Sequence, residues 1–145
     1  MIVITNASPL IALGQAQCLM ILRSLFGRVL MPDTVYQETV IGCTVPLQRQ
    51  AIEDAVDDFI EVATPTMRNR FSRNLGQGEA GVLDLALERQ ADLLLMDDRK
   101  ARNEAQSLGF ACALTSDVLR YAEQQGLVDY QAVVDTLRYH RIYLP

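Results

Sequence analysis

Two adjacent carboxylates, Asp97 and Asp98, end the segment Asp92–Asp98, whose sequence is DLLLMDD. A continuous run of large apolar residues without polar alternation is typical of a parallel strand buried on both faces. Ligands of open α/β sheets bind at the carboxyl ends of such strands. The two acids therefore lie where a functional site is expected, and one of them is also expected to cap the helix that follows.

Three further oxygen-bearing side chains have comparable places in the sequence. Asn6 follows a short β-branched strand, Glu38 lies early in a helix, and Glu79 lies in the first turn of the helix predicted over Gly76–Gln90. Every helix of a parallel sheet begins at the carboxyl edge, so these side chains are expected to meet Asp97 there. Helical spacing places Glu38 on the buried side of its helix. For Glu79, compensation of the helix dipole is the simpler alternative.

The chemistry of this set follows from its charge. Three carboxylates and an amide that converge without a lysine would repel one another, and burying them unpaired would be costly. A hard divalent cation removes that conflict. Ligands that are all oxygens favour Mg²⁺ or Mn²⁺, and the single histidine, His140, leaves little material for a zinc site or a histidine base. The set therefore indicates metal-assisted hydrolysis of a phosphodiester.

The elements that must position these side chains alternate between strand and helix along the chain. That order indicates a parallel sheet with right-handed crossovers, in a three-layer, Rossmann-like α/β fold. In the first helix, Ser8 is the expected N-cap, Pro9 the first helical residue, and a break is expected near Gly14. The predicted strands are Ile2–Thr5, Arg28–Met31, Phe59–Ala63, Leu93–Met96 and Phe110–Ala113.

Length and composition are those of a single globular domain over residues 1–145. The three cysteines are far apart and indicate a reduced, cytoplasmic protein. Residues Met1–Leu22 carry no charged side chain, but they include polar residues and no basic leader, so neither a signal peptide nor a membrane span is expected. The net charge of −5 argues against a broad electrostatic grip on nucleic acid.

Basic residues are nevertheless concentrated near the expected site. Arg68, Arg70 and Arg73 lie close together in a polar connection, and Arg99 and Lys100 follow the strand-end acids. A solvated loop is the simpler interpretation of the three arginines. The alternative is a lip beside the active site that contacts phosphates, together with the basic pair.

Several segments resemble the motifs of PIN-domain proteins, a family that includes the VapC-like ribonucleases. ITNASPLIAL is similar to the opening motif, MPDTVYQETV to the second acidic motif, and GEAGVLDLALERQADLLLMDD to the third and fourth motifs. Glu38 matches the family glutamate, and Glu79 stands where the family has an acid. Either Asp97 or Asp98 matches the strand-end aspartate, and the spacing from Glu79 favours Asp97. The chain resembles most a less characterised PIN subfamily with NASPLI and GEAE-type sequences.

Two positions depart from the family pattern. Asn6 replaces the aspartate that is usual in the first motif, and Leu95-Met96 replace the threonine-containing strand end of VapC-like members. An asparagine oxygen can coordinate Mg²⁺ but brings no charge. A weaker metal site, or a relic of a nuclease, is therefore expected.

The resemblance implies a ribonuclease that uses Mg²⁺ or Mn²⁺ to cleave single-stranded RNA. Glu38, Glu79 and Asp97 would be metal ligands, Asn6 would coordinate directly or orient a water ligand, and Asp98 would cap or assist. In the toxin-like branch of the family, a toxin–antitoxin role, a small cognate antitoxin and a homodimer are also implied.

Two other functions compete with this hypothesis. A PIN-fold binding module without turnover is favoured by Asn6. A dinucleotide site is suggested by Gly76–Gly81, GQGEAG, which has the form GxGxxG. The fingerprint requires its first glycine to follow a strand directly, and here a polar, arginine-containing connection intervenes. The dinucleotide site is therefore disfavoured.

Overall fold

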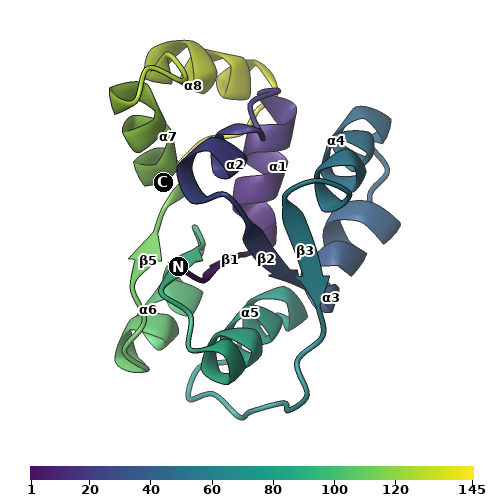
Figure 1. Ribbon diagram of the computed structural model, residues 1–145, viewed down its shortest axis with the longest axis vertical. Helices are drawn as coiled ribbons and strands as arrows, with labels where there is room; N and C mark the ends of the chain where they lie inside the picture. The colour runs from purple at the N-terminus through teal and green to yellow at the C-terminus, as the bar shows by residue number, and fades with distance from the viewer.

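The computed structural model of the protein describes all 145 residues. Its centre is a five-stranded sheet in which every neighbouring pair is parallel, with the order β3-β2-β1-β4-β5 (Figure 1). The predicted parallel α/β sheet is therefore confirmed, and each strand lies within the predicted segment or extends it by one residue. The strands are β1 (Val3–Thr5), β2 (Val29–Pro32), β3 (Ile60–Ala63), β4 (Leu93–Leu95) and β5 (Cys112–Ala113).

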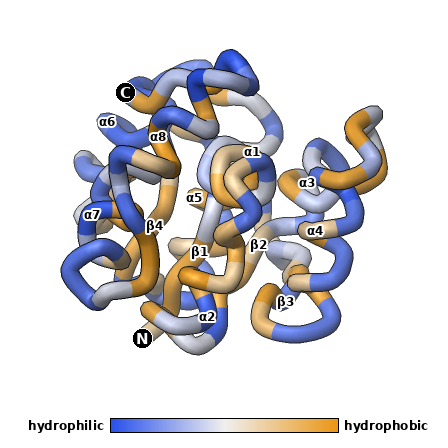
Figure 2. Tube along the Cα trace, turned by 90° about the horizontal axis from the view of Figure 1, so that it is seen from above, coloured by the Kyte–Doolittle hydropathy of each residue, from blue (hydrophilic) through white to orange (hydrophobic).

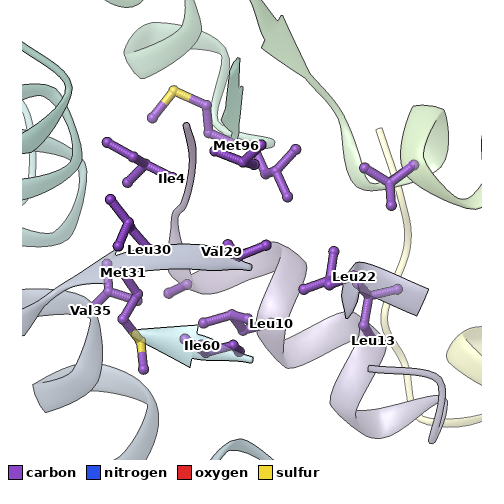
Figure 3. Close-up of a cluster of buried hydrophobic side chains, with 14 of the residues drawn as sticks. Ile4, Leu10, Leu13, Leu22, Val29, Leu30, Met31, Val35, Ile60 and Met96 are labelled. Atoms are coloured by element: carbon purple, nitrogen blue, oxygen red, sulfur yellow. The ribbon is translucent and has the colours of Figure 1, made fainter. Parts of the chain in front are cut away.

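The middle of the sheet is formed by β1, which pairs with β2 on one side and with β4 on the other. Ile4 pairs with Leu30, and Thr5 pairs with Leu95. All residues of β1 are buried, and the buried side chains around it form one hydrophobic core, part of which Figure 3 shows. The unbroken apolar sequence of β4 thus reflects a central position, covered from both sides.

Helices cover the sheet and complete the three layers. Helix α5 packs against β1 and β2, α2 against β2, and α7 against β5. Apolar residues are concentrated along the central strands, whereas most residues of α6 are hydrophilic (Figure 2). No helix has both the length and the apolar character that crossing a bilayer requires. The helices are α1 (Ala7–Gln15), α2 (Ile21–Phe26), α3 (Asp33–Tyr36), the π-helical turn η1 (Gln37–Ile41), α4 (Pro46–Val56), α5 (Gln77–Arg89), α6 (Arg99–Ser107), α7 (Thr115–Gln124) and α8 (Tyr130–Tyr139).

The start of the first helix differs from the prediction. Asn6, and not Ser8, is the N-cap of α1, and Pro9 is the third helical residue. Proline is tolerated there because the amides of the first turn have no intrahelical partner. The break expected near Gly14 is confirmed: α1 ends at Gln15, and Gln17 adopts a left-handed conformation with φ 56°. Asn6 therefore links β1 directly to α1.

The second prediction that was wrong concerns the orientation of Glu38. The prediction assumed a regular α-helix, but Gln37–Ile41 form a π-helical turn, in which the hydrogen bonds span one more residue. This wider turn changes which residues face the core: Thr39 and Val40 are buried, whereas Glu38 and Ile41 are exposed. π-turns are frequent at functional sites.

Candidate active site

Asn6 follows β1 directly and is hydrogen-bonded to the neighbouring strand β4. Its backbone N–H donates to the Leu95 carbonyl at 2.9 Å, and its own carbonyl accepts from Thr5 Oγ1 at 2.9 Å. The residue is only 3% exposed, and its side chain makes no capping hydrogen bond to α1. The amide is therefore free for another role, and its Oδ1 lies against the beginning of α5, near Gly78.

Glu38 reaches the same point from η1. The backbone of Gly78 lies close enough to its carboxylate to lower the pKa of Glu38, against the larger effect of burial. A Cβ built on Gly78 would overlap Glu38 Oε1 and would lie 3.4 Å from Asn6 Oδ1. The oxygens of Glu38 and Asn6 thus meet over a glycine that has no side chain to separate them. Although Glu38 as a whole is exposed, its carboxyl group is partly desolvated.

Glu79 brings a second carboxylate to this place. It lies in the first turn of α5 and is half-buried, and its Oε2 would be 2.7 Å from a Cβ built on Gly76. Partial burial, and then the negative charge of Glu79, raise the pKa of Glu38 above its usual value. None of the ion pairs in the structure involves either glutamate. Two acids therefore share one environment without a compensating side-chain cation.

Two glycines of α5 make this close approach sterically feasible. Gly78 and Gly81 lie one turn apart on α5, and Gly81 faces Thr34 of α3 as Gly78 faces Glu38. A Cβ on Gly81 would overlap Thr34 Oγ1 and would lie 3.3 Å from Pro32 Cβ. A side chain at Gly78 would displace the Glu38 carboxylate from the site, and a side chain at Gly81 would press against Thr34 and Pro32.

Asp97 extends from β4 and is held by a single residue of α7. Its Oδ1 accepts from the Thr115 backbone N–H at 2.8 Å, and its Oδ2 accepts from Thr115 Oγ1 at 2.7 Å. Thr115 was missed by the sequence analysis. The only signal for it was a hydroxyl residue after the fifth strand, and nothing in the sequence distinguished it from an ordinary helix start.

Asp98 has the structural role that was expected for one of the two acids. It is the N-cap of α6, and its carboxylate accepts from the Ala101 N–H at 2.8 Å. The two neighbouring acids are therefore directed to different helices: Asp98 to its own α6, and Asp97 to α7.

The donor set is suited to a hard cation, although it is not a closed cage. No three of the aspartate, glutamate, histidine and cysteine side chains are close enough together to hold a metal ion by themselves. The structure brings together Glu38, Glu79 and the Asn6 amide, while Asp97 is held on Thr115 after β4, the strand that pairs with β1. Carboxylate and amide oxygens without thiolate or imidazole fit Mg²⁺ or Mn²⁺.

The basic residues divide into free and engaged side chains. Arg68, Arg70 and Arg99 are exposed. Arg73 pairs with Glu104 at 3.6 Å, and Lys100 Nζ donates to a backbone carbonyl of the arginine loop, the segment 64–75, at 2.8 Å. Three of the five residues are thus available to a ligand, and two fasten the loop.

The arginine loop is held in place by carboxylates of α5 and α6. It leaves the end of β3 and runs past α5 before the chain enters that helix (Figure 1). Asp84 accepts from the Asn69 backbone at 2.8 Å, and Glu104 accepts from Ser72 Oγ and the Arg73 N–H, both at 2.7 Å. The Ser72 hydroxyl, before all other contacts, holds the pKa of Glu104 below its usual value. These hydrogen bonds hold the arginine loop in a defined conformation.

Comparison with known proteins agrees with this architecture. A family model described as a PIN domain matches residues 2–145. Among solved structures, the chain is similar to a PilT N-terminus domain protein from the hyperthermophilic archaeon Sulfolobus solfataricus P2, with a TM-score of 0.59 and 21% sequence identity over 84% of this chain and 93% of that chain. At this identity the similarity establishes the fold alone. No curated protein sequence matches the chain. Because the family model covers nearly its whole length, the chain belongs to the PIN-domain family.

Proposed function

We propose that the protein is a metal-dependent endoribonuclease that hydrolyses phosphodiester bonds of single-stranded RNA. The observation that carries the proposal is the meeting of Glu38, Glu79 and Asn6 at the carboxyl edge, where two acids approach without an ion-pair partner. Membership of the PIN-domain family, whose fold is of nuclease type, supports the same reaction.

The residues around the site would have different roles in binding the metal ion. Glu38, Glu79 and Asp97 would hold a Mg²⁺ or Mn²⁺ ion, with the Asn6 oxygen as a neutral ligand or as the partner of a water ligand. When bound, the ion would acidify a water molecule and screen the negative charge of the phosphate. Burial of Asn6 keeps its amide in one place, and the absence of a side chain at Gly78 leaves room for the Glu38 carboxylate.

The RNA would bind along the exposed arginine side chains that make no ion pair. Arg68 and Arg70 project from the fastened arginine loop, and Arg99 lies at the start of α6. These three guanidinium groups would contact phosphates, while Arg73 and Lys100 hold the loop. In a chain of net charge −5, such a local path favours a short single strand over an extended duplex.

Replacement of Asp97 tests the proposed reaction. The wild-type protein is expected to cleave a fluorescent single-stranded RNA only with Mg²⁺ or Mn²⁺, and Asp97→Asn is expected to lower kcat by about 100-fold or more, since even residues that only support a ligand cost 10- to 100-fold. The matched control is Asp57→Asn, which changes an exposed acid after α4 and should leave the rate unchanged. Equal rates for Asp97→Asn and the wild type would refute the assignment.

A binding module without turnover is the second candidate, and Asn6 favours it because this position contributes no charge. Asn6→Asp distinguishes the two functions. If the wild type lacks cleavage and the variant gains it, the protein is a nuclease relic that acts through binding. Metal-dependent cleavage by the wild type eliminates this candidate.

The proposal extends to the partners that the family resemblance implies. A toxin role would involve a small antitoxin that blocks the site, and a homodimer. Light scattering on the purified protein measures the oligomeric state, and growth arrest on expression of the wild type but not of Asp97→Asn would support the toxin role.

A further inference from the structure

We propose that Thr115 is a positioning residue that fixes the carboxylate of Asp97 for divalent-cation binding. This inference rests on the proposed function, and it assigns a role to a residue that neither the acidic motifs nor the family pattern singles out. Thr115 would act through Asp97 and would not touch the cation or the RNA itself.

The contact between the two residues fixes the carboxylate at both oxygens. The Thr115 N–H binds Oδ1 and the Thr115 hydroxyl binds Oδ2, at 2.8 and 2.7 Å. Two donors from one residue restrict rotation of the carboxylate as well as its position, and hydrogen bonds to an ionised acceptor are the strong ones. Each carboxylate oxygen keeps a second lone pair. The remaining lone pairs are therefore presented in one orientation, as a metal ligand requires.

The sheet register places Thr115 at the required position. Leu94 pairs with Cys112 and Leu95 with Ala113, and Asp97 bonds to Thr115 across the same separation of 18 residues. The contact thus continues the parallel alignment of β4 and β5 beyond the last ladder pair. Because both partners follow directly from the paired strands, the geometry does not depend on a flexible loop.

The hydroxyl contact exceeds what the start of α7 needs. The helix already has a carboxylate in its first turn, since Asp117 accepts from the Leu114 N–H at 2.9 Å. Thr115 is fully buried, and a valine of the same shape would fill its place without a polar group. A buried hydroxyl is favourable only when it is hydrogen-bonded, and here the partner is Asp97. The arrangement is explained by orientation of Asp97 more directly than by helix capping.

The test compares Thr115→Val, which removes the hydroxyl, with Thr115→Ser, which keeps it. Calorimetric titration with Mn²⁺ is expected to show about 10- to 100-fold weaker binding for Thr115→Val, the usual effect of losing a residue that orients a ligand. Thr115→Ser should restore binding to within about threefold of the wild type. In RNA cleavage, kcat should fall for Thr115→Val while KM is retained. The control is Thr136→Val, which removes a hydroxyl bonded to the Ala132 carbonyl in α8.

Thermal melting without metal shows whether each variant is folded. If Thr115→Val is unfolded, the same comparison is made with Thr115→Ala, which also lacks the hydroxyl and is smaller. In an Asp97→Asn background, loss of the Thr115 hydroxyl should have no further effect on Mn²⁺ affinity, because the hydroxyl acts through the ionised carboxylate.

The outcomes separate this inference from the proposed function. A folded Thr115→Val or Thr115→Ala protein with wild-type Mn²⁺ affinity and kcat would overturn the role of Thr115 alone. A wild-type protein that binds no Mn²⁺ and cleaves no RNA would overturn both proposals. Equal weakening by the serine and valine variants would show that the residue is needed for packing and not for its hydroxyl.

Discussion

Glu38 and Glu79 place two carboxylates in one partly desolvated environment, and the fold gives neither an ion-pair partner. The folded-state pKa of Glu38 is therefore raised, so its ionisation opposes folding at neutral pH. This opposition disappears when the pH falls below the ordinary glutamate value, because the side chain is then protonated in the folded and unfolded states alike. Functional sites commonly carry such a cost in stability.

We predict that Glu79→Gln stabilises the metal-free protein at neutral pH while weakening Mn²⁺ binding. The neutral amide removes the repulsion on Glu38, so the melting temperature should rise, and the rise should shrink as Glu38 becomes protonated in acid. Differential scanning calorimetry at several pH values, with and without Mn²⁺, measures both effects. A lower melting temperature without metal would contradict the repulsion between the two acids.

Gly78 is predicted to be required for the site but not for the fold. In Gly78→Ala the new Cβ overlaps Glu38 Oε1, the mobile end of a long side chain, which can move away at little cost. Mn²⁺ affinity should therefore fall by at least about tenfold, while thermal melting should change little because alanine favours the helix.

Gly14→Ala is the matched control for this substitution. Gly14 is also inside a helix, and a Cβ there would meet no atom within 4 Å. This change should stabilise the protein by about 0.5 to 1 kcal/mol and leave Mn²⁺ affinity unaltered. If Gly78→Ala bound Mn²⁺ with wild-type affinity, metal binding would not depend on the observed position of the Glu38 carboxylate.

At the scale of elements, the arginine loop is an irregular segment made rigid by acids from two helices. Glu88 binds Thr66, Asp84 binds Asn69, and Glu104 binds Ser72 and Arg73, so the anchors are distributed along the whole loop. Rigidity keeps Arg68 and Arg70 in place beside α5 and lowers the entropy lost when they bind a phosphate chain.

We predict that Glu104→Gln loosens this loop. The substitution removes the charge that binds Ser72 and Arg73, so amide hydrogen exchange over residues 64–75 should accelerate, and RNA binding should weaken through a higher KM. Glu53→Gln, which alters an exposed ion pair on α4, is the control and should have little effect.

The effect of Glu104→Gln should depend on pH. The pKa of Glu104 is lowered in the fold, so its contribution to stability is complete above the ordinary glutamate value and is lost as the pH falls through the lowered folded value. The difference in melting temperature between wild type and variant should therefore be largest near neutrality and vanish in strong acid. A constant difference would show that charge is not the reason for the anchoring.

For the molecule as a whole, the sequence predicted what depends on local patterns. Each of the five strands is a short apolar or β-branched segment, and Asp98 could be assigned as a cap because its partner, the Ala101 N–H, is three residues away. The order of strands and helices was then sufficient for the parallel sheet. The convergence of Asn6, Glu38, Glu79 and Asp97 on one cation stays a prediction.

What the sequence could not predict depends on contacts between distant residues. The bond from Thr115 to Asp97 spans 18 residues and requires the register of β4 and β5, and the bond from Ser72 to Glu104 spans 32. The π-helical turn that exposes Glu38 arises where η1 packs against α1 and α4, and no local propensity indicates it. The start of α1 was misplaced because Ser8 and Pro9 form a strong local signal, which the direct passage from β1 into α1 overrides.

The central proposal is that Glu38, Glu79 and Asp97 would hold one divalent cation, and calorimetric titration with Mn²⁺ tests it most directly. The titration is carried out on the wild type, on Glu38→Gln and on the control Glu53→Gln, at neutral pH and at lower pH. We expect binding by the wild type and the control, and at least about tenfold weaker binding by Glu38→Gln. The affinity of the wild type should fall at lower pH, because the raised pKa of Glu38 lets protons compete with Mn²⁺ for its carboxylate. Binding that is absent in the wild type, or equal in all three proteins, would contradict the claim.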